Sequence, residues 1–260
     1  LAAVQARAKM HEFRAAEEAF IPFRRTPETL FPLAVGILHD AAGAIADSFI
    51  DQAEGVVVPT AWEEDDGSIG QMVRFSASFF DAFLESQLNA ELSAEFSLLC
   101  AASYYLADSV GSAVVVAGRS EAPPLELGHG LARVAWHILR GDAGPIDGAS
   151  PHTEFGNRLL IALMSHFSLD ADAEEEVRFM CAALRASVYD NGSAREVVYA
   201  DTVTALCARK LENASRTILP PLSDLPLASW TEALRKPRFP KELWPAQRRI
   251  AEADLLKGNS

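Results

Sequence analysis

The sequence predicts a mainly α-helical protein, built as an irregular multi-helix bundle or an array of helical hairpins. Apolar residues recur at three- and four-residue steps through most of the chain, which is the spacing of one helix face. Segments that alternate apolar and polar residues, as half-buried strands do, are scarce. Apolar residues make up 49% of the 260 residues, so the chain can bury a substantial core.

The first half of the chain shows five helical segments and one interruption. The apolar spacing predicts helices over residues 4–20, 27–52, 71–88, 92–108 and 112–119. Thr26 is the expected N-cap of the second helix and Pro27 its first residue. Residues 55–70 break the pattern with a short extended piece at 56–59 and an acidic loop at 63–67. The helices at 92–108 and 112–119 are expected to form an αα-hairpin, because their many alanines allow close approach.

The second half continues with helices expected over residues 123–140, 153–167, 171–190 and 194–219. Between the first two of these, residues 141–148 are rich in Gly, Asp and Pro and read as a linker. A sub-boundary near 141–150 would divide the helical domain, predicted over residues 1–219, into two. Asp190-Asn191-Gly192-Ser193 predicts a clean helix stop followed by a new N-cap.

The C-terminal region changes character. Several prolines within residues 220–241 predict a strap that leaves the helical domain, with one short helix at 227–236. Residues 221–260 carry seven Lys or Arg against five Asp or Glu, whereas residues 1–220 carry 16 against 31. Because phosphate neutralisation dominates nucleic-acid binding, the acidic helical domain is a poor general platform for nucleic acid.

Complete catalytic motifs are absent from the sequence. It contains no Gly-rich phosphate loop ending in Gly-Lys-Ser/Thr, no nucleophile elbow and no dinucleotide-binding fingerprint. Four histidines at positions 129, 137, 152 and 166 are interpreted as surface or core residues. The three cysteines are odd in number and widely spaced, which favours buried thiols over disulfides or a zinc site. No metal site is predicted.

The most informative stretch is residues 243–247, which read Leu-Trp-Pro-Ala-Gln. An amphipathic helix follows, and then Gly258-Asn259-Ser260. This arrangement resembles the adenine-reading motif that opens the motor of superfamily 2 helicases, including the DEAD/DEAH-box proteins. The resemblance covers about twenty residues and implies ATP as the cofactor of the parent motor.

The resemblance also assigns roles to individual side chains. It implies that Gln247 pairs with the adenine edge, since an amide offers one acceptor and two donors. Pro245 would fix the start of the helix. Trp244 would pack on the motor or flank the base, and Trp230 is a further candidate to reach the adenine.

Residues 242–260 would then begin the motor, and residues 1–219 would form an N-terminal accessory domain. Residues 7–13 and the hairpin near Tyr104 loosely resemble helical regions that precede the motor in large bacterial helicases. Several of those act in phage defence with a nuclease partner. The expected partners are therefore the rest of the motor, a nuclease or other protein, and nucleic acid reached through the motor.

This chain alone is not expected to hydrolyse ATP, because it ends before the phosphate-binding loop. No secretory leader is recognised, and uninterrupted apolar runs such as residues 113–117 are too short to span a bilayer. A cytoplasmic location without membrane contact is therefore expected. Two alternatives stay open: a free-standing all-α adaptor without enzymatic activity, and a helical enzyme that uses an acid or a histidine in a pocket.

Overall fold

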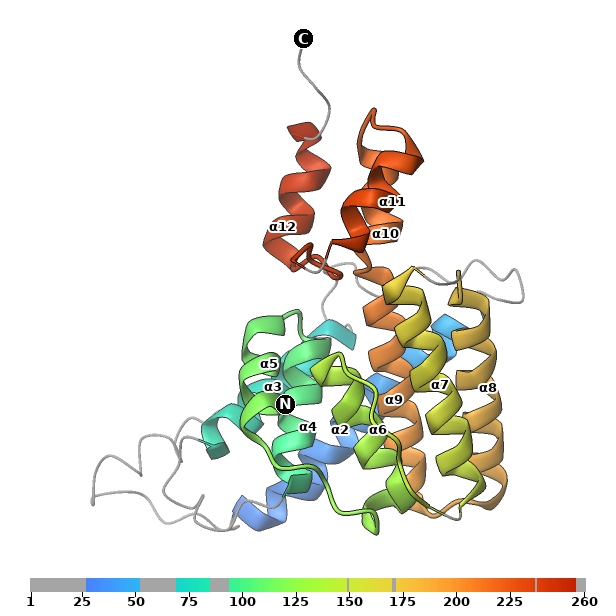
Figure 1. Ribbon diagram of the computed structural model, residues 1–260. Coiled ribbons are helices and arrows are strands. Elements are labelled where there is room, and N and C mark those ends of the chain that lie inside the picture. Colours follow the sequence, from blue (N-terminus) through green and yellow to red (C-terminus); the bar gives the residue numbers. More distant parts are fainter. Residues whose placement is uncertain are drawn as a thin grey trace, which may run out of the picture.

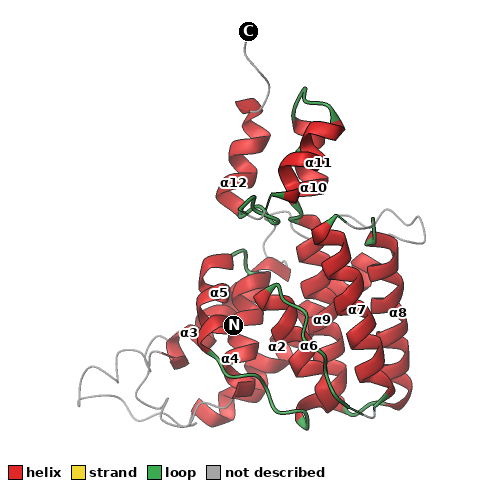
Figure 2. Cartoon of the chain, viewed as in Figure 1, coloured by secondary structure: helices red, strands yellow, loops and turns green. Residues whose placement is uncertain are grey.

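The protein is mainly α-helical, which confirms the predicted fold class. The computed structural model describes residues 27–51, 69–84, 94–148, 150–169, 172–236 and 238–255. Every regular element within these ranges is helical (Figure 2). Within the described residues, β-type pairing is limited to one isolated antiparallel bridge between Ala214 and Glu242. Three predicted features lie outside the described residues: the helix at 4–20, the extended piece at 56–59 and the acidic loop at 63–67.

Helices α2 to α9 form a bundle, called the body below (Figure 1). Helix α9 packs against α2, α4, α6 and α8, so it is the central element. The other close pairs are α2 with α3, α3 with α4, α4 with α5, and α7 with α8. The bounds are α2 (Pro27–Asp51), α3 (Ile69–Leu84), α4 (Ala94–Leu106), α5 (Val110–Arg119), η3 (Leu127–Gly130), α6 (Leu131–Arg140), α7 (Pro151–Ser168), α8 (Glu174–Asn191) and α9 (Ala194–Glu212).

One continuous apolar cluster fills the body and extends from α2 to α9. The cluster includes residues on both sides of the loop at 141–150. Ile146 of this loop is buried, and its N–H and C=O bond the side-chain amide of Asn157 at 3.1 and 3.0 Å. The loop is therefore packed onto the body, because the Asn157 amide satisfies the backbone groups that burial removes from water.

Residues Phe31–Asp51 of α2 are long and apolar enough to cross a membrane by length and composition. This helix is not an uninterrupted apolar run, because it contains His39, Asp40 and Asp47, so it lies outside the expectation about such runs. In the body α2 packs against α3, α8 and α9, and Ala34, Leu38 and Ala42 are fully buried. Core helices of globular proteins pass the same test, so the finding is weak evidence for a membrane span.

Two predicted helices differ from the observed ones for identifiable reasons. The helix expected at 123–140 begins only at Leu131, because Gly128, His129 and Gly130 have φ of 57°, 46° and 90°. These left-handed values interrupt a right-handed helix. The helix expected at 194–219 ends at Glu212, since Ala214 is extended and pairs with Glu242.

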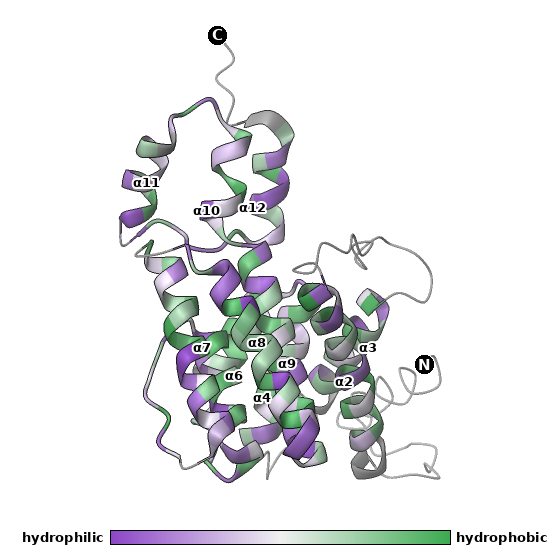
Figure 3. Ribbon diagram, turned by 90° about the vertical axis from the view of Figure 1, so that its right-hand side faces the viewer, coloured by the Kyte–Doolittle hydropathy of each residue, from purple (hydrophilic) through white to green (hydrophobic). Residues whose placement is uncertain are grey.

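The chain after α9 forms a smaller helical unit, called the C-terminal module below, which projects beyond the end of α9 (Figure 1). It comprises α10 (Ser215–Ile218), η4 (Pro220–Leu222), α11 (Leu227–Arg235), α12 (Pro245–Ile250) and a π-helical turn, η5 (Ala251–Leu255). The ribbons of these helices carry both apolar (green) and polar (purple) positions (Figure 3). The module has its own buried core of Leu219, Trp230, Leu234, Leu243 and Ala251.

Candidate functional site

The segment that leads into α12 is fixed to the end of α9 by backbone hydrogen bonds. The N–H of Leu243 donates to the carbonyl of Asn213 at 2.8 Å, and the N–H of Ser215 donates to the carbonyl of Lys241 at 2.9 Å. These two bonds flank the Ala214–Glu242 bridge. The start of α12 is therefore held at a defined place beside the body.

A buried ion pair reinforces this attachment. The ammonium of Lys210 on α9 contacts the carboxylate of Glu242, and the hydroxyl of Tyr105 on α4 donates to the same carboxylate. The Lys210 and Tyr105 side chains are almost fully buried. Burial raises the pKa of Tyr105 well above its usual value, and the Glu242 charge raises it further. We call these three residues the anchor cluster.

The motif residues at the start of α12 adopt helix-initiating geometry. Trp244 is the extended N-cap residue and Pro245 the first helical residue. The Oε1 atom of Gln247 accepts the Trp244 N–H at 2.9 Å, which satisfies a donor that the helix leaves free. Gln247 is exposed, and Trp244 is 47% exposed. The indole lies against Gly111 of α5, where an added Cβ would lie 3.7 Å from it.

Trp230 occupies a different environment from Trp244 and Gln247. It is 6% exposed, and its Nε1 donates to the Ser223 hydroxyl at 2.6 Å. Its ring meets Phe239 edge to face, with the centroids 6.3 Å apart. Trp230 therefore stabilises the core of the C-terminal module, and its contact with adenine stays a prediction.

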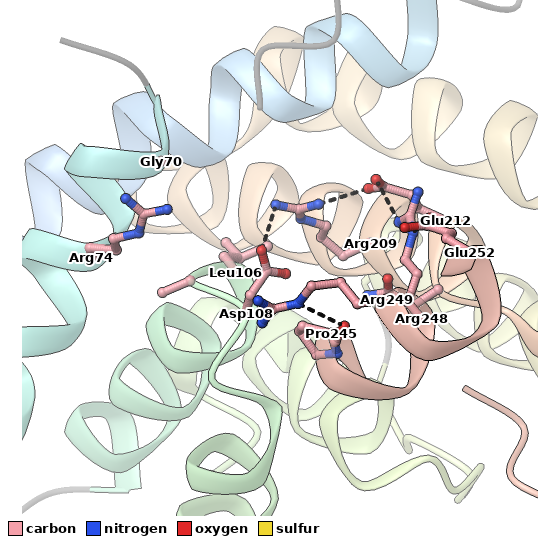
Figure 4. Close-up of a pocket in the computed structure, with 12 residues that line it drawn as sticks. Gly70, Arg74, Leu106, Asp108, Arg209, Glu212, Pro245, Arg248, Arg249 and Glu252 are labelled. Atoms are coloured by element: carbon pink, nitrogen blue, oxygen red, sulfur yellow. Dashed lines mark hydrogen bonds and ion pairs between the residues drawn. The ribbon is translucent and has the colours of Figure 1, made fainter. Parts of the chain in front are cut away.

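A cleft of about 700 Å³, the junction cleft, lies between the body and α12 (Figure 4). Helix α3, the end of α4, the end of α9, α12 and η5 contribute its walls. The charged residues that line it are Arg74, Asp108, Arg209, Glu212, Arg248, Arg249 and Glu252. The four arginines outnumber the three carboxylates in a chain whose net charge is −13.

Carboxylates hold two of these arginines in place. Arg209 lies 2.8 Å from Glu212 and 3.8 Å from Asp108. Arg248 lies 3.3 Å from Glu212 and 2.9 Å from Glu252. Burial opposes the charge on Arg248, but the two glutamates outweigh it and raise the pKa of the guanidinium. Glu212 thus connects α9 to α12 through both arginines.

A second polar cluster surrounds Glu196 near the start of α9, away from the junction cleft. Glu196 accepts from the N–H and hydroxyl of Ser193 at 2.8 Å. Nδ1 of His129 and Nδ1 of His152 each lie 2.9 Å from its Oε1. Burial disfavours the charge, but the Ser193 and histidine contacts outweigh it and lower the pKa of Glu196 from 4.5 to about 2. No group of metal-ligating residues was found among the described residues.

The low pKa of Glu196 predicts acid sensitivity. A folded-state pKa of about 2 against a usual 4.5 contributes stability that is fully present above about pH 4.5. This contribution, on the order of 3 kcal/mol, is lost as the pH falls from 4.5 through 2. Denaturant unfolding between pH 2 and 6 should show a shallower pH dependence for Glu196→Gln than for the wild type. Identical slopes in both proteins would contradict the assignment.

A third polar cluster ties α2, α8 and α9 together around Asp201, which is fully buried. Asp201 accepts from Nε of Arg185 at 2.7 Å and from the hydroxyl of Tyr189 at 2.8 Å. Nε2 of His39 lies 2.9 Å from Oδ2 of Asp201, the oxygen that also accepts the Tyr189 hydroxyl. Arg185 also pairs with Asp47 of α2 at 2.8 Å. Burial disfavours the charge of Arg185, but Asp201 and these contacts raise its pKa overall.

Sequence reasoning missed the junction cleft and both polar clusters, because their members are far apart in the chain. The Gly128-His129-Gly130 run was a usable signal, since glycines around a histidine indicate an unusual backbone rather than a helix. The cysteines are free and buried, as predicted.

No known protein family, curated protein or solved structure matches this chain.

Proposed function

We propose that this chain is the N-terminal accessory region of an ATP-dependent helicase, and that α12 begins the motor. The observation that carries the proposal is the Leu-Trp-Pro-Ala-Gln motif at residues 243–247, in which Pro245 starts a helix and Gln247 is exposed. The side chain of Gln247 is therefore accessible to a nucleotide that the rest of the motor would hold. The three free thiols support a reducing, cytoplasmic setting.

The proposed chemistry depends on the two ends of the Gln247 amide. Adenine presents an amino donor at N6 and an acceptor at N7, which an amide can satisfy with its Oε1 and its Nε2–H. In this structure Oε1 accepts the N–H of Trp244. Because an amide oxygen has two lone pairs, nucleotide binding would add the adenine amino group as a second donor to Oε1, so that one side chain links the helix start to the base.

The proposed role of the body is to brace the motor and to bind a partner protein. The anchor cluster and the backbone bridge fix α12 to α9, so a motor that continues from α12 would be held against the body. The negative charge of the chain disfavours broad phosphate contacts and favours protein partners, such as a nuclease. Nucleic acid would be reached mainly through the motor.

The first test is the coding sequence downstream of Ser260. A strand and a Gly-x-Gly-Lys-Thr-type loop within about fifteen residues would support the helicase proposal. A reading frame that ends at Ser260 would overturn it. The alternative, a free-standing helical adaptor, is favoured by the cap that Gln247 makes, because capping gives this side chain a structural role without ATP.

Gln247→Glu separates the two roles of this residue in the protein encoded by the full reading frame. Glutamate keeps the oxygen that caps Trp244 but lacks the N–H donors that adenine N7 requires. We expect the melting temperature to stay within about 2 °C. We expect ATP affinity to fall by about tenfold or more, which corresponds to losing one good bidentate contact.

Gln247→Ala is the companion variant, because it removes both the cap and the adenine contact. It should lower both stability and ATP affinity, which isothermal titration and thermal unfolding would measure. Unchanged ATP affinity in Gln247→Glu would show that this side chain does not read adenine.

A further inference from the structure

The junction cleft brings together four arginines from three distant parts of the sequence. Arg74 comes from α3, Arg209 from α9, and Arg248 with Arg249 from α12. Arg209 and Arg248 are held by carboxylates, as described above. Among the described residues, no carboxylate lies within 4 Å of Arg74 or Arg249, which are both exposed. The cleft thus presents two guanidinium groups without acidic partners.

The cleft is organised before any ligand arrives. Glu212 pairs with both Arg209 and Arg248. Figure 4 shows the side chains of Arg74 and Arg249 directed from opposite walls into the space beside Leu106. A planar guanidinium matches the two oxygens of a phosphate in a bidentate contact, so an arginine pair across a cleft suits a phosphate chain.

The walls of the cleft also indicate how a ligand would be recognised. Its lining residues include no aromatic side chain on which a base could stack. Its uncharged surface comes from Gly70, Leu106, Ala107, Asn213 and Pro245. A volume of about 700 Å³ accommodates a few nucleotides of one strand but not a duplex, whose broad phosphate surface the acidic chain would repel.

We propose that the junction cleft binds the backbone phosphates of a single nucleic-acid strand without reading its bases. The inference rests on the proposed helicase function, which brings such a strand to this chain. Because α12 forms one wall and α3, α4 and α9 form the other, an occupied cleft would also connect the motor-proximal helix to the body. The strand would contact Arg74 and Arg249 first.

The test uses the 260-residue chain and a fluorescein-labelled oligo-dT of about 20 nucleotides, followed by fluorescence anisotropy at about 50 mM salt. We expect the double variant Arg74→Glu/Arg249→Glu to bind about tenfold more weakly or worse than the wild type. Arg158→Glu/Arg195→Glu is the matched control, because these two arginines are each 61% exposed on other surfaces. It carries the same charge change and should stay within about twofold of the wild type.

Salt dependence gives an independent readout. Neutralising two or three single-strand phosphates predicts a slope of log affinity against log salt of about −1.4 to −2.1. An oligo-dA of equal length should bind within about threefold of oligo-dT, since the cleft offers no stacking surface. Circular dichroism checks that the variants are folded, and Arg74→Gln/Arg249→Gln replaces the glutamate variant if that protein does not fold.

Several outcomes would overturn the proposal. These are no saturable binding by the wild type, equal weakening in both double variants, or occupation of the cleft by free ATP but not by the oligonucleotide. The assay needs no ATP hydrolysis, so its failure is separate from that of the helicase proposal. A stop codon after Ser260 with intact cleft binding would remove the helicase and leave a strand-binding adaptor.

Discussion

Glu242→Ala is expected to lower the free energy of unfolding by about 3–5 kcal/mol, because it leaves the Lys210 ammonium buried without its carboxylate. Lys210 is 3% exposed, so in the folded protein its ammonium relies on Glu242 rather than on solvent. The Tyr105 hydroxyl also loses its acceptor. Since folded domains are stable by only about 5–15 kcal/mol, this one change would remove a large share of the total.

The same substitution should loosen the C-terminal module from the body. Urea unfolding measures the stability change, and limited proteolysis near residues 236–241 measures the loosening. Glu232→Ala in α11 is the matched control, because Glu232 is exposed and makes no ion pair with the described residues. A loss below about 1 kcal/mol for Glu242→Ala would show that the anchor cluster contributes little.

A double variant distinguishes the buried charge from the attachment itself. Lys210→Met/Glu242→Leu replaces the ion pair by apolar side chains of similar size, which is often neutral in buried sites. We expect it to recover most of the stability lost in Glu242→Ala, since the two backbone bonds around Ala214 remain. A double variant as unstable as Glu242→Ala would mean that the charges themselves are required.

Asp201→Ala is expected to be similarly destabilising, by about 3–5 kcal/mol, because three side chains converge on this fully buried carboxylate. Removing it leaves the guanidinium of Arg185 with Asp47 alone, and Asp47 is largely exposed. Asp201→Asn should not fully rescue the loss, since its single NH2 group replaces one oxygen and would face either Arg185 at Oδ1 or Tyr189 and His39 at Oδ2.

Denaturant unfolding of the two Asp201 variants tests this expectation. Asp190→Ala at the exposed end of α8 is the control and should change stability by less than about 0.5 kcal/mol. If Asp201→Ala matched that control, the cluster between α2, α8 and α9 would not stabilise the body. Full stability of Asp201→Asn would instead show that the carboxylate charge is dispensable.

The sequence alone determined the fold class and most helix positions, because these depend on local rules. Apolar spacing located α2 and α7 to within a few residues, and Pro245 marked the start of α12. Ser193 was recognisable as an N-cap, and it makes a reciprocal capping box with Glu196. These features require only neighbours within one or two helical turns.

Tertiary structure decided everything that depends on residues far apart in the chain. Helix α9 ends at Glu212 because residues 213–215 pair with 241–243, which no local pattern could indicate. The histidines of the Glu196 cluster meet one carboxylate only because η3 and α7 approach α9. The junction cleft likewise exists only because α12 returns beside α3 and α9, which gathers scattered arginines of an acidic chain into one charged site.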